Sequence, residues 1–214
     1  TAHLYYQPIN VLQALGHLLK AEKELENIDT YRYDVVDITR QMLADYGKYI
    51  HKCISDAYKE KNIEKFDLYT SKFLQMILDQ DLLLSTRKEF LLGEYIRQAE
   101  ACGSNPTEKR MFINNAKRQI TTWTSVNSSL HDYAHKEWNG ILSTLYAPRW
   151  KRYFDYLRAK LEEKNPKEID FFAMETSWIE NKEEFSAIPV KKEIEIAKTI
   201  YHNYADEIKQ VYLK

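Results

Sequence analysis

Apolar residues recur at helical spacing along most of the chain. In residues 8–25, 31–62 and 64–84 they follow one another at intervals of three or four positions, which is the period of an amphipathic helix. The second run also carries an apolar residue at every seventh position from Val36 to Ala57. We expect the second and third runs to pair as an antiparallel hairpin of long helices.

Six further segments continue this pattern: residues 87–101, 107–123, 133–145, 148–164, 171–185 and 194–208. Asn165-Pro166 and Ile188-Pro189 separate the later ones, because proline ends a helix. Gly93, inside one segment, is expected to let a neighbouring backbone or side chain come close. Strands do not alternate with helices anywhere. The sequence therefore predicts an all-α fold, a single bundle-like domain of about eight or nine helices spanning residues 1–214.

Residues 119–150 are the least helix-like stretch. Polar turn formers fill its middle, and Trp123, Trp138 and Trp150 lie along it. A polar loop between aromatics, framed by stiff helices, is typical of a surface that touches a ligand or a partner. Trp138 and Trp150 have the spacing of core residues. For Trp123 and Tyr133, which bracket the polar segment, core packing and ligand contact both stay open.

Composition excludes several classes of protein. Lys and Arg total 31 against 32 Asp and Glu, a net charge of −1, so a basic nucleic-acid-binding face is not expected. No apolar run approaches the roughly 18–20 residues needed to span a membrane. Residues 1–7 lack the features of a signal peptide, and the chain begins without Met, so we expect a processed form or an excised piece. Cys53 and Cys102 are expected to be free thiols.

Motifs for nucleotides, serine hydrolases and zinc proteases are absent. His131 and His135 are four residues apart, with Asp132 and Glu137 nearby, but a zinc site needs a third firm ligand at a known spacing. Most carboxylates fall on solvated helix faces, and sequence cannot supply the separation that an acid–base pair requires. We therefore expect no catalytic residues, no metal site and no cofactor in this chain.

Three stretches, taken in order, resemble one family. Residues 31–41 read YRYDVVDITRQ, and residues 90–93 read FLLG with Gln98-Ala99 behind them. Trp123 is then followed by DYA at 132–134, by Trp138 and Gly140, and by YAPRW at 146–150. Together they resemble the C-terminal all-helical domain of the α-N-acetylglucosaminidases, the family 89 glycoside hydrolases that remove terminal α-linked GlcNAc. Each motif alone is weak, whereas the three in order are specific.

The resemblance implies roles for several residues. In that family the catalytic glutamates lie in a (β/α)₈ barrel, and the helical domain packs on the barrel and closes one side of the sugar pocket. The matching pocket-wall residues are Trp123, Leu130 and Tyr133. The residues matching structural, ion-paired positions are Arg32, Asp34, Asp37, Arg40 and Arg149. Two departures from the family pattern are the segment TSVNSSLH at 124–131, which lacks Gly and Pro, and His135 in place of a small polar residue.

The leading hypothesis is a C-terminal helical domain of an α-N-acetylglucosaminidase-like hydrolase, without its barrel and inactive alone. The implied partners are the catalytic barrel of the same polypeptide and, through the shared pocket, a glycan ending in α-GlcNAc. Nucleic acid and a membrane span are not expected. The resemblance also implies a secreted, periplasmic or lysosomal parent protein. The alternative is a freestanding helical module that binds a protein or peptide. An independent helical enzyme is disfavoured by the missing motifs.

Overall fold

The computed structural model describes residues 5–126 and 129–213 and contains nine α-helices within them. The α-helices are α1 (Pro8–Lys20), α2 (Glu22–Leu25), α3 (Asp29–Lys59), α4 (Ile63–Leu84), α5 (Leu92–Glu100), α6 (Pro106–Gln119), α7 (Ala147–Leu161), α8 (Phe171–Glu180) and α9 (Glu193–Tyr212). A 3₁₀ turn, η1 (Lys88–Phe90), precedes α5, and a π-helical turn, η2 (Leu142–Tyr146), leads into α7. The predicted all-α fold is confirmed. Among the helices described, none is long and apolar enough to cross a bilayer.

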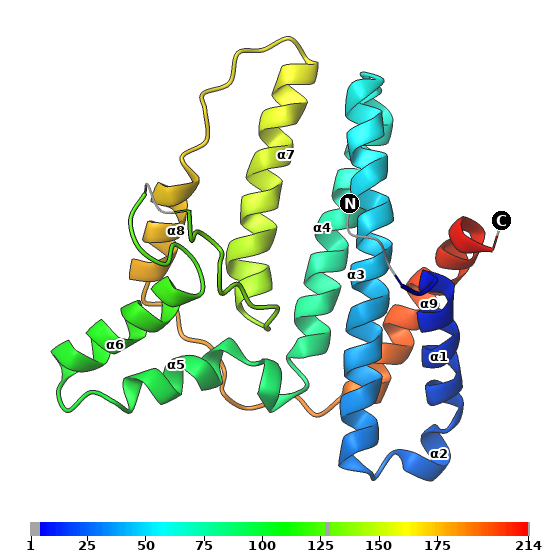
Figure 1. Cartoon of the computed structure of the whole chain (residues 1–214), viewed down its shortest axis with the longest axis horizontal. Coiled ribbons are helices and arrows are strands. Elements are labelled where there is room, and N and C mark those ends of the chain that lie inside the picture. The colour runs from blue at the N-terminus through cyan, green and yellow to red at the C-terminus, as the bar shows by residue number, and fades with distance from the viewer. Residues whose placement is uncertain (1–4, 127–128, 214) are drawn as a thin grey trace.

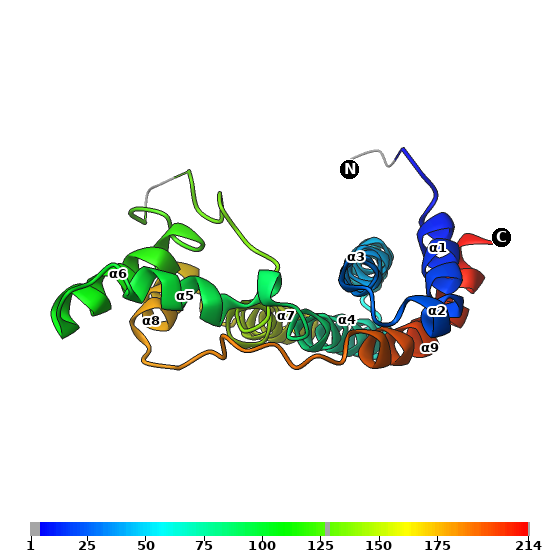
Figure 2. The ribbon, with the colours of Figure 1, turned by 90° about the horizontal axis from the view of Figure 1, so that it is seen from below.

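Helices α3 and α4 form the long antiparallel pair at the centre of the molecule (Figure 1). Helices α1 and α9 pack against α3, and α7 packs along α4 on the other side. Helices α5, α6 and α8 form a smaller group beyond α7 (Figure 1). Seen from below, α3 and the segment between α6 and η2 rise from the same side of the layer that contains α4 and α7 (Figure 2).

Aromatic side chains hold α4 and α7 together. The Trp150 ring lies 5.1 Å from the ring of Phe73 on α4 and stacks 5.3 Å from that of Phe154. Phe154 also meets Phe66 of α4 edge to face. Ring pairs of this kind add stabilisation beyond the apolar area they bury. This cluster fixes the start of α7, and α7 in turn carries part of the candidate site.

The expected helix at 133–145 forms only from Ile141 onward, where it continues into η2 and α7. Gly140 has a φ of +94°, and the peptide N–H groups of Gly140 and Ser143 donate to the carboxylate of Asp81 on α4, at 2.7 and 3.1 Å. The side chain of Asn139 donates to the same carboxylate. The Asp81 carboxylate accepts hydrogen bonds from backbone N–H groups that would otherwise lack a partner at the start of a helix. The helix therefore begins only after Gly140, with η2 and α7.

Other predicted segments also differ from the helices observed. The segment at 8–25 divides at Ala21 into α1 and α2, and the one at 87–101 begins as η1 before α5 starts at Leu92. The segments at 107–123 and 171–185 end early, at Gln119 and Glu180. The chain after α8 crosses α5 closely. A Cβ built on Gly93 would lie 2.2 Å from the carbonyl oxygen of Ser186, so the predicted close approach at this glycine is confirmed.

Candidate functional site

Trp123 and Tyr133 lie together at the two ends of a loop, and we call the described residues of this loop (123–126 and 129–133) the aromatic loop. Their ring centroids are 5.5 Å apart, at an interplanar angle of 70°. Trp123 is half-buried, whereas Tyr133 is 70% exposed and Leu130 39% exposed. Two residues of the predicted polar segment, 127 and 128, lie outside the described residues. The sequence-predicted wall residues thus include one anchored ring and one ring presented to solvent.

The backbone at both ends of the aromatic loop is strained. Trp123 has a φ of 60° and Asp132 a φ of 56°, values that cost residues other than glycine about 1–2 kcal/mol each. Hydrogen bonds hold both positions, because the Trp123 N–H donates to Arg118 at 2.8 Å and the Asp132 N–H donates to Thr121 at 2.9 Å. The Tyr133 N–H donates to Leu130 at 2.9 Å. These bonds bring the loop ends, and hence the two rings, side by side.

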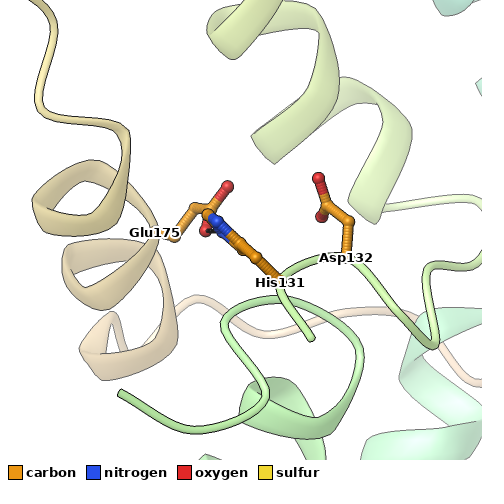
Figure 3. Close-up of side chains that lie close together, drawn as sticks. All are labelled: His131, Asp132 and Glu175. Atoms are coloured by element: carbon orange, nitrogen blue, oxygen red, sulfur yellow. Dashed lines mark hydrogen bonds and ion pairs between the residues drawn. The ribbon is translucent and has the colours of Figure 1, made fainter. Parts of the chain in front are cut away.

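A charged cluster anchors the aromatic loop to two helices. One guanidinium nitrogen of Arg149, Nη1, lies 2.9 Å from Oδ2 of Asp132 and 2.6 Å from Oε1 of Glu175. The second carboxylate oxygen of Glu175 meets Nε2 of His131. Figure 3 shows the His131 ring reaching Glu175 on α8, with the Asp132 carboxylate beside it. The loop therefore binds α7 through Arg149 and α8 through Glu175.

Electrostatics favour the charged form of Arg149. Burial opposes the charge on this guanidinium, but Asp132 and Glu175 outweigh burial and raise its pKa above the usual value. Glu175 itself is completely buried, so its two hydrogen-bond partners compensate for the loss of water around its carboxylate.

The same cluster contains side chains of the kinds that bind metal ions. Ligand atoms of His131, Asp132 and Glu175 all lie within 4.8 Å of one another. The guanidinium of Arg149 already bridges the two carboxylates, so a cation would have to displace it. The histidine pair singled out in the sequence does not converge either, since Nδ1 of His135 contacts the Asp132 carbonyl at 3.2 Å instead. The chemistry of this cluster fits an internal ion-pair network.

Beside the cluster is a hollow of about 400 Å³. Its lining combines charged and aromatic side chains: His131, Asp132, Arg149, Trp150, Tyr153, Phe171 and Glu175. A second groove, of about 500 Å³, runs between α3 and α4 and also reaches Trp150 and Glu137. Trp150 lines both hollows, and the first also reaches His131 and Asp132 of the aromatic loop. We call the residues that line these two hollows the concave face.

The remaining residues that the resemblance marks as structural lie on α3. Arg32 pairs with Asp29 at 3.1 Å and with Glu193 of α9 at 3.6 Å. Arg40 pairs with Asp37 on its own helix and reaches Glu137, beyond the aromatic loop, at 4.0 Å. Helix α3 is thereby tied to α9 at one end and to the region after the aromatic loop further along.

Asp34 differs from its neighbours in this motif. Its side chain is exposed, and in the part of the chain that the structure describes it makes no ion pair or hydrogen bond. Among residues 5–126 and 129–213, the partner of Asp37 is Arg40 of the same helix. Neither carboxylate therefore ties α3 to another helix.

Sequence reasoning did not single out Glu175. A local signal was present, because Glu175 shares one helical face with Phe171, Trp178 and Ile179, all at spacings of three or four. An acidic residue on an otherwise apolar face indicates a buried, paired carboxylate. Its partner His131 is 44 residues away, so the pairing itself is not visible in the sequence.

Comparison with solved structures places this fold among the glycoside hydrolases. A family 89 glycoside hydrolase from Clostridium perfringens, solved with PUGNAc, has a TM-score of 0.88 and 30% identity to this chain. The same hydrolase, solved with its substrate GlcNAc-α-1,4-galactose, has a TM-score of 0.89 and 29% identity. These matches cover 94% and 96% of this chain but 24% and 25% of the hydrolase chains.

The sequence comparison defines the family. Residues 1–203 match the family model of the α-N-acetylglucosaminidase (NAGLU) C-terminal domain, and the chain belongs to that family. Human α-N-acetylglucosaminidase is 25% identical over 208 residues, which are 94% of this chain and 28% of the human sequence. The chain thus spans about a quarter of the length of these relatives. The family resemblance inferred from the motifs is confirmed.

Proposed function

We propose that residues 1–214 form one helical domain that packs on a (β/α)₈ catalytic domain of the same polypeptide and walls its pocket for terminal α-linked GlcNAc. The observation that carries this proposal is the Trp123–Tyr133 ring pair, presented on a loop that is fixed to the helical core. Support also comes from a relative with 29% identity, which was solved in complex with GlcNAc-α-1,4-galactose.

The physical role of such a wall is binding and exclusion of water. An exposed aromatic ring packs on the apolar face of a sugar, and a few polar groups then fix its orientation. Hydrolysis needs two carboxyl groups that flank the glycosidic bond, one of them able to give up a proton. Asp132 and Glu175 lie near the wall, but both are engaged by Arg149. We therefore assign the proton-transfer chemistry to the catalytic domain.

The concave face is our candidate for the surface that meets the catalytic domain. It includes His131 and Asp132 of the aromatic loop, so a domain seated there would bring its own pocket close to Tyr133. Its groove is lined by apolar groups such as Phe73 and Met76, with Lys48 and Glu137 among its charged members. Apolar lining with scattered charges suits an interface between domains of one chain.

A first experiment assays the 214-residue chain alone on an aryl α-N-acetylglucosaminide. We expect no release of the aryl group above the buffer rate, because neither carboxylate beside the wall is free to act as an acid or a base. Measurable turnover that survives repeated purification would show that this chain has a catalytic centre of its own.

A second experiment supplies the catalytic domain. This chain would replace the matching region of the Clostridium perfringens hydrolase, and Tyr133→Ala would be compared with Tyr5→Ala. Loss of an aromatic contact worth about 1.5 kcal/mol lowers kcat/KM about tenfold for Tyr133→Ala, whereas Tyr5→Ala, at a fully exposed tyrosine, leaves it unchanged. A folded, active chimaera that is insensitive to Tyr133→Ala would remove the wall role. It would favour the alternative of an interaction module.

A further inference from the structure

We propose that His131 and Glu175 form a pH-dependent latch on the aromatic loop, in which Glu175 is the positioning residue and protonation of His131 tightens the hold. The significance of the latch for sugar binding rests on the proposed function. Its existence does not, because the cluster and the loop are both within this chain.

Glu175 is the point at which three segments of the chain meet. Its carboxylate, completely buried on α8, accepts a hydrogen bond from Arg149 of α7 on one oxygen and contacts His131 of the aromatic loop with the other. Arg149 also holds Asp132, the residue between His131 and Tyr133. The position of Tyr133 therefore depends on contacts made by the two residues that precede it.

The charge of the cluster changes with the protonation of one group. Asp132 and Glu175 carry two negative charges against the single positive charge of Arg149, so with neutral His131 the cluster has one excess negative charge. Protonated His131 balances it and makes its hydrogen bond to Glu175 charge-assisted, which is roughly twice as strong as a neutral one. Tyr146 of η2 also lies within charge range of Asp132, Arg149 and Glu175, and burial raises its pKa to about 12, so it stays neutral here.

The side chain of His131 is accessible to solvent, whereas that of Glu175 is not. The side chain of His131 is 36% exposed, so protons exchange freely with its ring, whereas the Glu175 side chain is 0% exposed. The rim of the hollow also contains Tyr153 of α7. An imidazole is the side chain that ordinarily gains its charge in mildly acidic solution. The latch would therefore tighten as the solution becomes more acidic.

Hydrogen exchange of the backbone amides at the ends of the aromatic loop measures how firmly the loop is held. The N–H groups of Trp123, Asp132 and Tyr133 donate the hydrogen bonds that close the aromatic loop, so their hydrogen exchange reports its opening. With intrinsic rates corrected for pH, we expect protection of these amides to rise about threefold or more from pH 7.5 to pH 5.5. His131→Gln, which cannot become charged, would abolish that rise.

His135 provides a matched control in the same part of the chain. It is an exposed histidine whose ring, among the described residues, hydrogen-bonds to a backbone carbonyl and makes no ion pair, so His135→Gln is expected to keep the full pH response. Glu175→Gln is expected to lose the response and to lower protection at both pH values. A pH response that persists in His131→Gln, or that disappears in His135→Gln, would overturn the latch.

The experiment separates the latch from the proposed function. It uses this chain alone, without sugar or catalytic domain, so the latch can fail while Tyr133 still contributes to the chimaera's kcat/KM. Conversely, a working latch in a chain whose Tyr133→Ala chimaera is fully active would leave the switch intact and remove only the sugar-binding role.

Discussion

Two glycines within helices lie in opposite surroundings. At Gly93 of α5, an added Cβ would meet backbone atoms of Ser186 at 2.2 Å and of Phe185 at 2.4 Å. Backbone cannot rotate away as a side chain can, so Gly93→Ala would push the segment after α8 off α5. We expect the free energy of unfolding to fall by about 2–3 kcal/mol, measured by urea denaturation.

Substitution of Gly47 in α3 is expected to have the opposite effect on the free energy of unfolding. The nearest atom to an added Cβ there is the methyl carbon of Met76, at 3.8 Å, which is an ordinary contact. Because alanine loses less backbone entropy than glycine when a helix forms, Gly47→Ala is expected to raise the free energy of unfolding by about 0.5–1 kcal/mol. Equal effects of the two substitutions would mean that the segment at 185–186 does not cross α5 this closely.

At the scale of one element, α5 is stabilised by a local charge network. Hydrogen bonds from Arg97 and then Gln98 lower the pKa of Glu94 to about 2. A carboxylate with a lowered folded-state pKa stabilises the fold above its unfolded pKa of about 4.3, and this contribution is lost as the pH falls toward 2. We therefore expect Glu94→Gln to show a shallower loss of stability than the unchanged chain between about pH 4.5 and 2, followed by thermal unfolding.

Glu184→Gln, outside α5, is the control for Glu94→Gln. Glu184 is exposed and has no ion pair among residues 5–126 and 129–213, so its neutralisation should leave the acid limb of the stability curve unchanged. If Glu94→Gln follows the same acid limb as Glu184→Gln, the network on α5 contributes nothing to acid stability.

Element boundaries also show where sequence reasoning succeeds and where it stops. The runs at 31–62 and 64–84 became α3 and α4, because a long apolar seam at helical spacing has few alternatives. The run at 133–145 is helical only from Ile141, because the carboxylate of Asp81, 59 residues from Gly140, accepts the hydrogen bond of the Gly140 N–H. A remote partner overrides local periodicity, and no local pattern reports it.

The residues of the candidate site likewise fall into those that the sequence predicts and those that it does not. Trp123 and Tyr133 were found through the family motif, and the structure places their rings together, although their role in binding stays a prediction. Glu175 needed the tertiary structure, because the contacts that make it central come from Arg149 and His131, 26 and 44 residues away. Motifs locate the residues that touch a ligand more readily than those that hold them.

At the scale of the whole molecule, the concave face determines where a catalytic domain can sit. Ala44 of α3 lines its groove, and an arginine at this position would place a charge in the proposed interface. A buried charge without a partner is strongly unfavourable, so Ala44→Arg should lower the melting temperature of the chimaera by about 5 °C or more. The isolated chain, in which the groove is open to water, should melt as before.

Helix α9 offers the matched surface, because it lies beyond α3 on the side away from the aromatic loop (Figure 2). Asn203→Arg on that helix introduces the same charge at an exposed position and should change neither the chimaera nor the isolated chain. Differential scanning calorimetry of the four variants and their two unsubstituted parents gives the comparison directly. If Ala44→Arg leaves the chimaera unchanged while Asn203→Arg lowers its melting temperature, the catalytic domain packs on the α9 side. The aromatic loop would then face away from the chemistry that we propose it serves.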